Sequence, residues 1–131
     1  MIIELSNGSC LENTHIQSLE KTNNVWNLKM ANKQLIPILE SEYAWIMTIC
    51  QFLVEIRNDF AFNLHAISFL IPTNTGFLMG WKGEPPVEVT EAEGQLIKEK
   101  LTKEPFLYLK LADRINELSE YNVSPSEYNK L

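Results

Sequence analysis

Few side chains in this sequence belong to the types that usually do chemistry, and those few are widely spaced. The two cysteines, Cys10 and Cys50, are forty residues apart, and the two histidines, His15 and His65, lie in different predicted strands. A metal site needs several converging histidine, cysteine or carboxylate ligands, and no spacing of this kind is present. We therefore expect no metal and no cofactor, and we interpret the cysteines as small, buried or half-buried thiols.

Motifs for nucleotide binding and for nucleophilic catalysis are also missing from the sequence. The five glycines form neither a phosphate-binding loop nor a dinucleotide-binding fingerprint, and no serine lies in a nucleophile elbow. Carboxylates gather at Glu88, Glu91 and Glu93, where the start of a helix explains them better than acid–base catalysis does. We therefore predict no catalytic residues and lean against an enzyme.

Aromatic side chains in two predicted strands are the strongest candidates for a binding surface. Trp26 lies in one strand and Phe77 with Trp81 in another, each with apolar neighbours two residues away on the same face. Such a face either packs in the core or stays open as a platform that stacks unpaired bases or binds a protein. Together with Lys82 and His65, these aromatic residues are the candidate binding site.

The composition is that of an acidic globular protein. The 131 residues include 11 lysines and arginines and 17 aspartates and glutamates, so the net charge is −6. Hydrophobic residues make up 45% of the chain, which is enough for a core and unlike a disordered sequence. The acidic balance disfavours non-specific binding to nucleic acid.

The chain shows no pattern for export or for a membrane. Its first residues have neither the basic nor the apolar region of a signal peptide. The most apolar run, 43–54, is shorter than the roughly 20 residues that a membrane span needs. We therefore expect a cytoplasmic protein with no membrane partner.

Alternating apolar residues and turn signals predict a mainly antiparallel sheet. The turn at Ser6–Ser9 contains Asn-Gly, which favours a hairpin. Pro37 marks its strand as an edge strand or a bulge, because proline cannot donate a hydrogen bond to a neighbouring strand. The predicted strands are 2–5, one within 10–20, 25–30, 35–39, 60–71, 77–81 and 87–89.

Three helices are predicted, and the first is the longest. Ser41 is a suitable N-cap, and the apolar residues after it predict one core helix over about 41–57. A capping box at 90–93 begins a second helix that ends near 103. Pro105 can begin a third helix, which Leu107, Leu111, Ile115 and Leu118 predict by their helical spacing through Tyr121. A strand over 106–111 is the alternative. The predicted fold class is therefore α+β: an antiparallel sheet packed on one long apolar helix, with two further helices in the C-terminal half.

Two segments of the chain match when the sequence is displaced by 49 residues. Lys33 then falls on Lys82, and Pro37 falls on Pro86. The identities are few, so the sequence leaves open whether a sheet-then-helix unit is duplicated. We predict a single domain over 1–122 and a C-terminal tail over 123–131.

These observations favour a non-enzymatic protein-interaction or regulatory module of a bacterial or phage-type cytoplasm, which binds another protein or self-associates as a homodimer. The first alternative is a single-stranded nucleic-acid-binding domain that uses the aromatic sheet face. A second alternative is a small ligand-binding domain or enzyme that uses His65. A sheet section followed by a helix, twice over, is similar in layout to whirly-type single-strand-binding domains, but a shared topology does not define a function.

Overall fold

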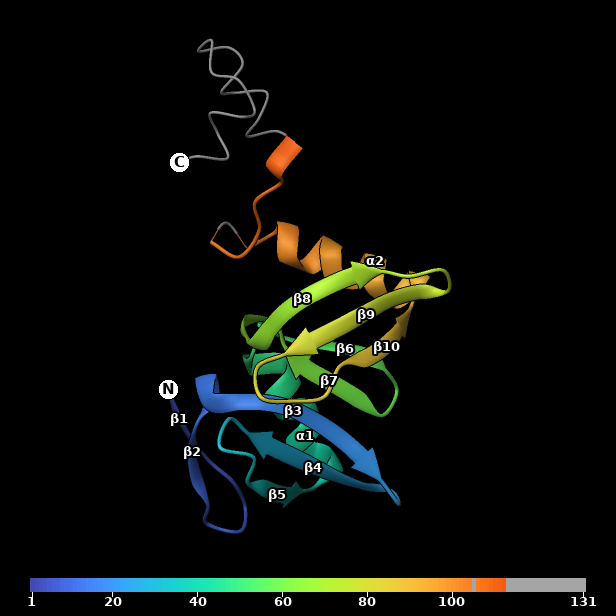
Figure 1. The fold of residues 1–131 in the computed structure, drawn as a ribbon. Helices are drawn as coiled ribbons and strands as arrows, with labels where there is room; N and C mark the ends of the chain where they lie inside the picture. The colour runs from blue at the N-terminus through green and yellow to red at the C-terminus, as the bar shows by residue number, and fades with distance from the viewer. Residues whose placement is uncertain (105, 113–131) are drawn as a thin grey trace. The chain divides into compact units, whose positions relative to one another are not determined.

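The computed structural model describes residues 1–104 and 106–112, and the chain divides into two compact units, Met1–Glu99 and Lys100–Leu131. Antiparallel strands dominate, with 43% of the described residues in strands. In chain order the elements are β1 (Ile2–Glu4), β2 (Cys10–Glu12), the 3₁₀ turn η1 (Asn13–His15), β3 (Ile16–Thr22), β4 (Val25–Met30), β5 (Leu35–Ile38), α1 (Glu40–Ile49), β6 (Leu53–Arg57), β7 (Phe60–Asn63), the 3₁₀ turn η2 (Leu64–Ala66), β8 (Ile67–Pro72), β9 (Gly76–Trp81), β10 (Val87–Thr90) and α2 (Glu91–Thr102) (Figure 1).

The strands of the described residues form three antiparallel sheets. The five-stranded sheet has the order β5-β4-β3-β7-β6, the three-stranded sheet has the order β10-β9-β8, and β1 pairs with β2 alone. In Figure 1 the three-stranded sheet lies above β3 and β4, and α1 lies behind the five-stranded sheet. Pairing of β3 with β7 joins the early strands to the later ones, with Leu19 opposite Ala61.

The main core lies where the β1–β2 hairpin, the five-stranded sheet and α1 meet. Its members are apolar and almost fully buried, and each buried leucine or isoleucine contributes about 1.5–3 kcal/mol relative to exposure. They are Ile3, Leu5, Leu11, Ile16, Leu19, Trp26, Leu28, Ile38, Tyr43, Ile46, Cys50, Leu53 and Ala61.

Aromatic rings pack the three-stranded sheet onto the five-stranded one. Trp81 of β9 stacks on Phe60 of β7, with ring centroids 5.3 Å apart and planes 14° apart. The same indole meets Phe62 edge to face at 5.7 Å. These contacts hold the end of β9, and the loop that follows it, against β7.

The predicted long helix over 41–57 is wrong. α1 ends at Ile49, and 53–57 is strand β6, in which Glu55 and Arg57 are exposed while Leu53 and Ile56 are buried. A short apolar run satisfies both the helical and the strand period, and β-branched residues such as Ile56 favour the strand. The fold is therefore mostly antiparallel sheet. In the described part of the chain, α1 has 10 residues and α2 has 12.

The termini of the predicted elements also differ from the structure. The N-cap of α1 is Leu39 instead of Ser41, and Glu42 supplies the capping carboxylate by accepting a 2.9 Å hydrogen bond from the Leu39 amide. The predicted strand over 60–71 is two strands separated by η2. Residues 106–110 form a turn followed by irregular chain, so the alternative strand there is absent. Most of the predicted third helix, and the predicted tail, lie outside the described residues.

The order of elements recurs along the chain: two strands, a 3₁₀ turn, three strands and a helix, twice. The 3₁₀ turns start at residues 13 and 64 and the helices at residues 40 and 91, which is 51 residues in each case. The displacement of 49 residues taken from the sequence is therefore wrong for these elements. The residues that it matches, such as Lys33 with Lys82 and Pro37 with Pro86, lie two positions away from equivalent places in the two halves.

Among the residues that the structure describes, no helix has both the length and the apolar character that a membrane span requires.

Candidate functional site

The three aromatic residues of the predicted site are buried. Trp26, Phe77 and Trp81 expose 2%, 3% and 6% of their surface. Trp26 stacks on Tyr43 with ring centroids 3.7 Å apart, and its indole nitrogen donates a 2.9 Å hydrogen bond to Glu40. Of the two alternatives for these rings, the structure has the packed one, because all three form parts of the core.

Phe77 and Trp81 face different neighbours from those of Trp26. The Phe77 ring lies against Gly94 of α2, where an added Cβ atom would overlap it, and the Lys98 ammonium lies 4.9 Å from the ring centroid. Trp81 packs on β7, as described above. The rings of Trp26 and Trp81 thus support two separate parts of the core.

The other two predicted site residues, Lys82 and His65, do lie together. They line a pocket of about 540 Å³ to which His15 and Lys33 also contribute. We call these four residues the basic pocket. The two histidines come from η1 and η2, and the two lysines come from the β4–β5 and β9–β10 loops, so both halves of the chain supply one 3₁₀ turn and one loop.

The backbone of the two loops explains how the lysines come together. Lys33 has a left-handed φ of 71°, and its amide donates a 2.8 Å hydrogen bond to the Met30 carbonyl. Gly83 has a φ of 80°, a conformation that glycine adopts without a side-chain clash. A Cβ atom on Gly83 would lie 3.7 Å from Cε of Lys33, so the Lys33 side chain extends to the loop that carries Lys82.

Hydrogen bonds hold the rim of the basic pocket in place. The Ala31 amide donates to the His15 carbonyl at 2.8 Å, and the Lys82 amide donates to the Ala66 carbonyl at 3.2 Å. Asn63 is buried and bridges the halves, because its side-chain amide donates to the Ile16 carbonyl at 2.9 Å while its oxygen accepts from the His65 amide at 2.8 Å. Such support reduces the reorganisation that binding requires.

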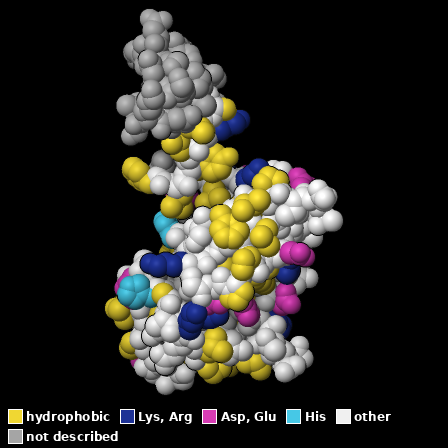
Figure 2. Space-filling model, viewed as in Figure 1, with side chains coloured by type: hydrophobic (Ala, Val, Ile, Leu, Met, Phe, Trp, Pro, Cys, Tyr) yellow, Lys and Arg dark blue, Asp and Glu magenta, His cyan; other side chains and the backbone are white. Residues whose placement is uncertain are grey.

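The lining of the basic pocket carries positive charge and no carboxylate. Its lining includes no aspartate or glutamate, and neither Lys33 nor Lys82 forms an ion pair with a described residue. By contrast, Lys29 is paired with Glu84 at 2.7 Å. Figure 2 shows dark blue side chains beside cyan histidines on the left, while most of the magenta acidic side chains lie on the right.

Two more side chains shape this site. Gln17 also lines the pocket and is only 6% exposed, and its side-chain nitrogen has no hydrogen-bond partner among the described residues. The His65 ring meets Phe52 edge to face at 6.0 Å, which orients the imidazole. The pocket therefore offers ammonium, imidazole and amide donors, a set that suits an anion such as a phosphate group. Within the described residues no group of histidine, cysteine or carboxylate side chains could hold a metal ion.

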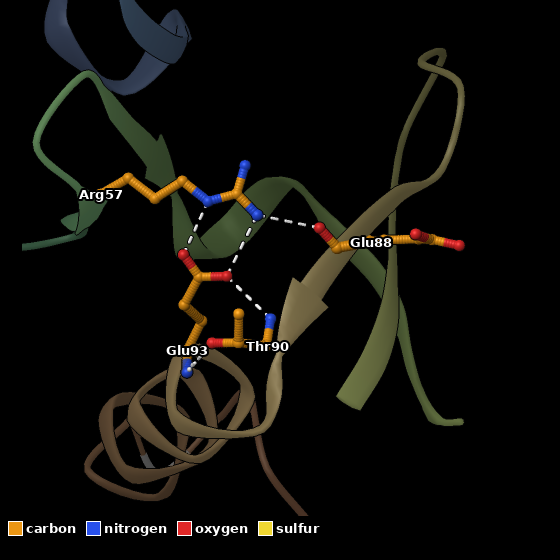
Figure 3. A network of polar contacts seen from close by, with 4 residues as sticks. All are labelled: Arg57, Glu88, Thr90 and Glu93. Carbon is orange, nitrogen blue, oxygen red and sulfur yellow. Dashed lines mark hydrogen bonds and ion pairs between the residues drawn. The ribbon is translucent and has the colours of Figure 1, made fainter. Parts of the chain in front are cut away.

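A second charged cluster is held together by its own hydrogen bonds (Figure 3). Nε of Arg57 lies 2.6 Å from one Glu93 oxygen, and a terminal nitrogen donates to the other oxygen at 3.0 Å and to the Glu88 carbonyl at 2.9 Å. The Thr90 amide donates to Glu93 at 2.8 Å. The hydrogen bond from Arg57 holds the pKa of the Glu93 carboxyl below its usual value, although partial burial opposes this. This cluster joins β6 to the start of α2 and is structural.

Sequence reasoning missed Lys33, His15 and Gln17 as site residues. His15 lies 50 residues before His65 and Lys33 lies 49 residues before Lys82, so the adjacent sequence gives no sign of a shared site. One signal was present: Lys33 and Lys82 coincide when the sequence is displaced by 49 residues.

Comparison with known proteins identifies the class of fold. The sequence matches no known protein family and no curated protein. Among solved structures, the chain is similar to the LytTr DNA-binding domain of a putative methyl-accepting/DNA response regulator from Bacillus cereus. The TM-score is 0.58 at 12% sequence identity, over 77% of this chain and 94% of that chain. The chain therefore has a LytTr-like fold, that is, a similar arrangement of antiparallel strands.

Proposed function

We propose that this chain is a regulatory DNA-binding domain that contacts the backbone of duplex DNA through the basic pocket. The structural neighbour is a DNA-binding domain by its name, and a shared fold raises this expectation without defining a role. It favours the nucleic-acid alternative over a module that binds only proteins.

The observation that carries the proposal is the convergence of two unpaired lysines and two histidines in a pocket without a carboxylate. Lysine side chains contact phosphate oxygens as point charges, and such contacts fix the position of a protein on DNA. The site residues lie on loops and 3₁₀ turns that a rigid set of strands supports, which is where binding residues are commonly found.

Duplex DNA fits the structure better than single-stranded nucleic acid. Sequence-tolerant binding of single strands uses exposed aromatic rings on which bases stack. The three rings of the predicted platform are at most 6% exposed, and no phenylalanine, tryptophan or tyrosine side chain lines the basic pocket. The net charge of −6 also opposes contact with DNA over most of the surface. Binding therefore depends strongly on the few cations that lack an acidic partner.

Selection from a pool of random-sequence duplex oligonucleotides tests this proposal with the unmodified chain. We expect enrichment of duplexes and weaker binding of the enriched pool by Lys33→Gln and by Lys82→Gln. Lys21→Gln is the matched control, because it removes the same charge from a lysine that already pairs with Glu40 at 3.4 Å. Failure to enrich any duplex, or an equal loss of affinity in the control, would contradict the proposal.

A further inference from the structure

Strand β8 has one unpaired edge. It pairs with β9 on one side, with Leu70 opposite Met79 and Ile71 opposite Leu78. On its other side no strand of the described chain pairs with it, so β8 is an edge of the three-stranded sheet. Free backbone amides and carbonyls at a sheet edge can accept an additional strand.

The other edges of the two larger sheets carry features that discourage pairing. Pro37 lies within β5, and β6 presents Glu55 and Arg57. In β10 the carbonyl of Glu88 already accepts a hydrogen bond from Arg57. β8 has no charged residue, its bulge is confined to its first residues, and its only proline, Pro72, is the last residue. Natural proteins use charges and prolines to block pairing at edges, and β8 lacks both over its central part.

The face of β8 that points to solvent is apolar as well. Phe69 and Ile71 expose 36% and 50% of their surface, and Leu78 lies directly opposite Ile71 on the same face. Figure 2 shows a band of yellow side chains across the region where β8 and β9 lie in Figure 1. A sheet extended from this edge would continue the apolar face and bury these side chains further.

Charge indicates what kind of strand could pair there. Residues 60–81 contain no aspartate, glutamate, lysine or arginine, although the chain as a whole has a net charge of −6. A charged partner would find no counter-charge on this hairpin. A second copy of the chain presents the same uncharged surface, so two copies can approach here without bringing like charges together.

The first half of the chain provides a precedent for pairing at this position. β3 and β8 follow the two 3₁₀ turns and start at residues 16 and 67, so they occupy equivalent places in the recurring order. β3 pairs with β4 on one side and accepts β7 as an antiparallel neighbour on the other. The equivalent side of β8 is the edge that has no partner.

We infer that two copies of this chain pair β8 with β8 in antiparallel fashion, across a two-fold axis. The two three-stranded sheets become one sheet of the order β10-β9-β8-β8-β9-β10. A two-fold dimer of this kind is self-complementary and closed, so it exposes no further copy of the same edge. The inference does not depend on the proposed function.

Sedimentation velocity of the full chain over a range of concentrations tests the inference. We expect a dimer in the unmodified chain and a rise of about tenfold or more in the dissociation constant of Ile71→Lys, because the lysine must be partly desolvated at the pairing edge. Leu35→Lys is the matched control, since Leu35 is 59% exposed on the proline-containing edge strand β5. We expect Leu35→Lys to dimerise like the unmodified chain.

Hydrogen exchange of the unmodified chain gives a second test that needs no mutation. We expect the β8 amides to become protected as the protein concentration rises, while the β5 amides do not change. A monomer at every concentration, as would result if a segment of the same chain covered the edge, overturns the inference. So does unchanged dimerisation of Ile71→Lys or equal weakening by Leu35→Lys.

Discussion

Arg57 on β6 and Glu93 in the first turn of α2 form a two-pronged ion pair, with nitrogen–oxygen distances of 2.6 and 3.0 Å. Glu93 also accepts a hydrogen bond from the Thr90 amide, so one carboxylate both caps the helix and holds the strand. Its counterpart 51 residues earlier (93 − 42) is Glu42, which accepts from the Leu39 amide and from the Ser6 amide. In each half of the recurring order, a glutamate in the first turn of the helix joins that helix to the strand pair at the start of the same half.

Removal of the Glu93 carboxylate should destabilise the fold. Glu93→Ala loses the ion pair and the helix cap, and we expect the free energy of unfolding to fall by about 1–2 kcal/mol. The expected loss is modest because the Arg57 side chain is 40% exposed and water screens its charge. Urea unfolding measures the change. Glu91→Ala is the control in the same helical turn, and an equal loss there would assign the effect to the helix instead of the ion pair.

Stability should decline in acid because of the same two glutamates. The hydrogen bond from Arg57 lowers the pKa of Glu93, and the hydrogen bonds from the Leu39 and Ser6 amides lower the pKa of Glu42. A carboxyl with a lower pKa in the folded state stabilises the fold above its unfolded pKa of about 4.3, and this contribution is lost as the pH falls toward the folded pKa. The unfolding free energies of the unmodified chain and of Glu93→Gln should therefore converge as the pH falls below the unfolded pKa. A difference that persists or grows there would contradict this assignment.

Gly94→Ala should destabilise the protein, although the same change usually stabilises a helix by roughly 1 kcal/mol. The added Cβ atom would overlap the Phe77 ring, including the ring carbon nearest the backbone. Overpacking of this kind costs about 1–3 kcal/mol, so the sign reverses. The thermal midpoint measured by circular dichroism reports it. A midpoint at or above that of the unmodified chain would show that Phe77 moves without cost.

The hydroxyl of Tyr43 should contribute to the joint between α1 and β6. It donates a 2.5 Å hydrogen bond to Glu55, and burial, followed by this carboxylate, raises the pKa of Tyr43 above its ordinary value. We expect Tyr43→Phe to lose about 1 kcal/mol of unfolding free energy, because the stacking on Trp26 is retained. We expect Tyr43→Ala to lose about 3–5 kcal/mol, because both contacts are removed. Similar losses in the two variants would mean that the ring contributes little.

Local sequence patterns located much of the sheet but not the path of the chain after α1. The alternation around Trp26 and the Asn-Gly turn depend on neighbouring residues, and β4 and the β1–β2 hairpin lie where these patterns indicate. The run from Tyr43 to Ile56 is apolar before and after Ile49, so the spacing of its apolar residues could not show that the helix ends there. The pairing of β6 with β7 decides that point, and this pairing is absent from local sequence.

The candidate site was harder to predict because its residues meet only through tertiary structure. Trp26 and Trp81 have neighbours typical of either a core or an open face, and the strand pattern cannot tell these apart. Lys33 and Lys82 lie in separate loops, and the pairing of β3 with β7 brings the two halves together. The net charge of −6 also conceals a pocket whose lining contains no carboxylate.

The most direct test of the proposed function is the salt dependence of duplex binding by the unmodified chain and by the double variant Lys33→Gln/Lys82→Gln. Each phosphate contact by a lysine contributes about 0.9 to the slope of log affinity against log salt concentration. We therefore predict that the double variant binds the enriched duplex more weakly and that its slope is smaller by about 1.8. An unchanged affinity and slope would contradict the assignment of the basic pocket as the DNA contact.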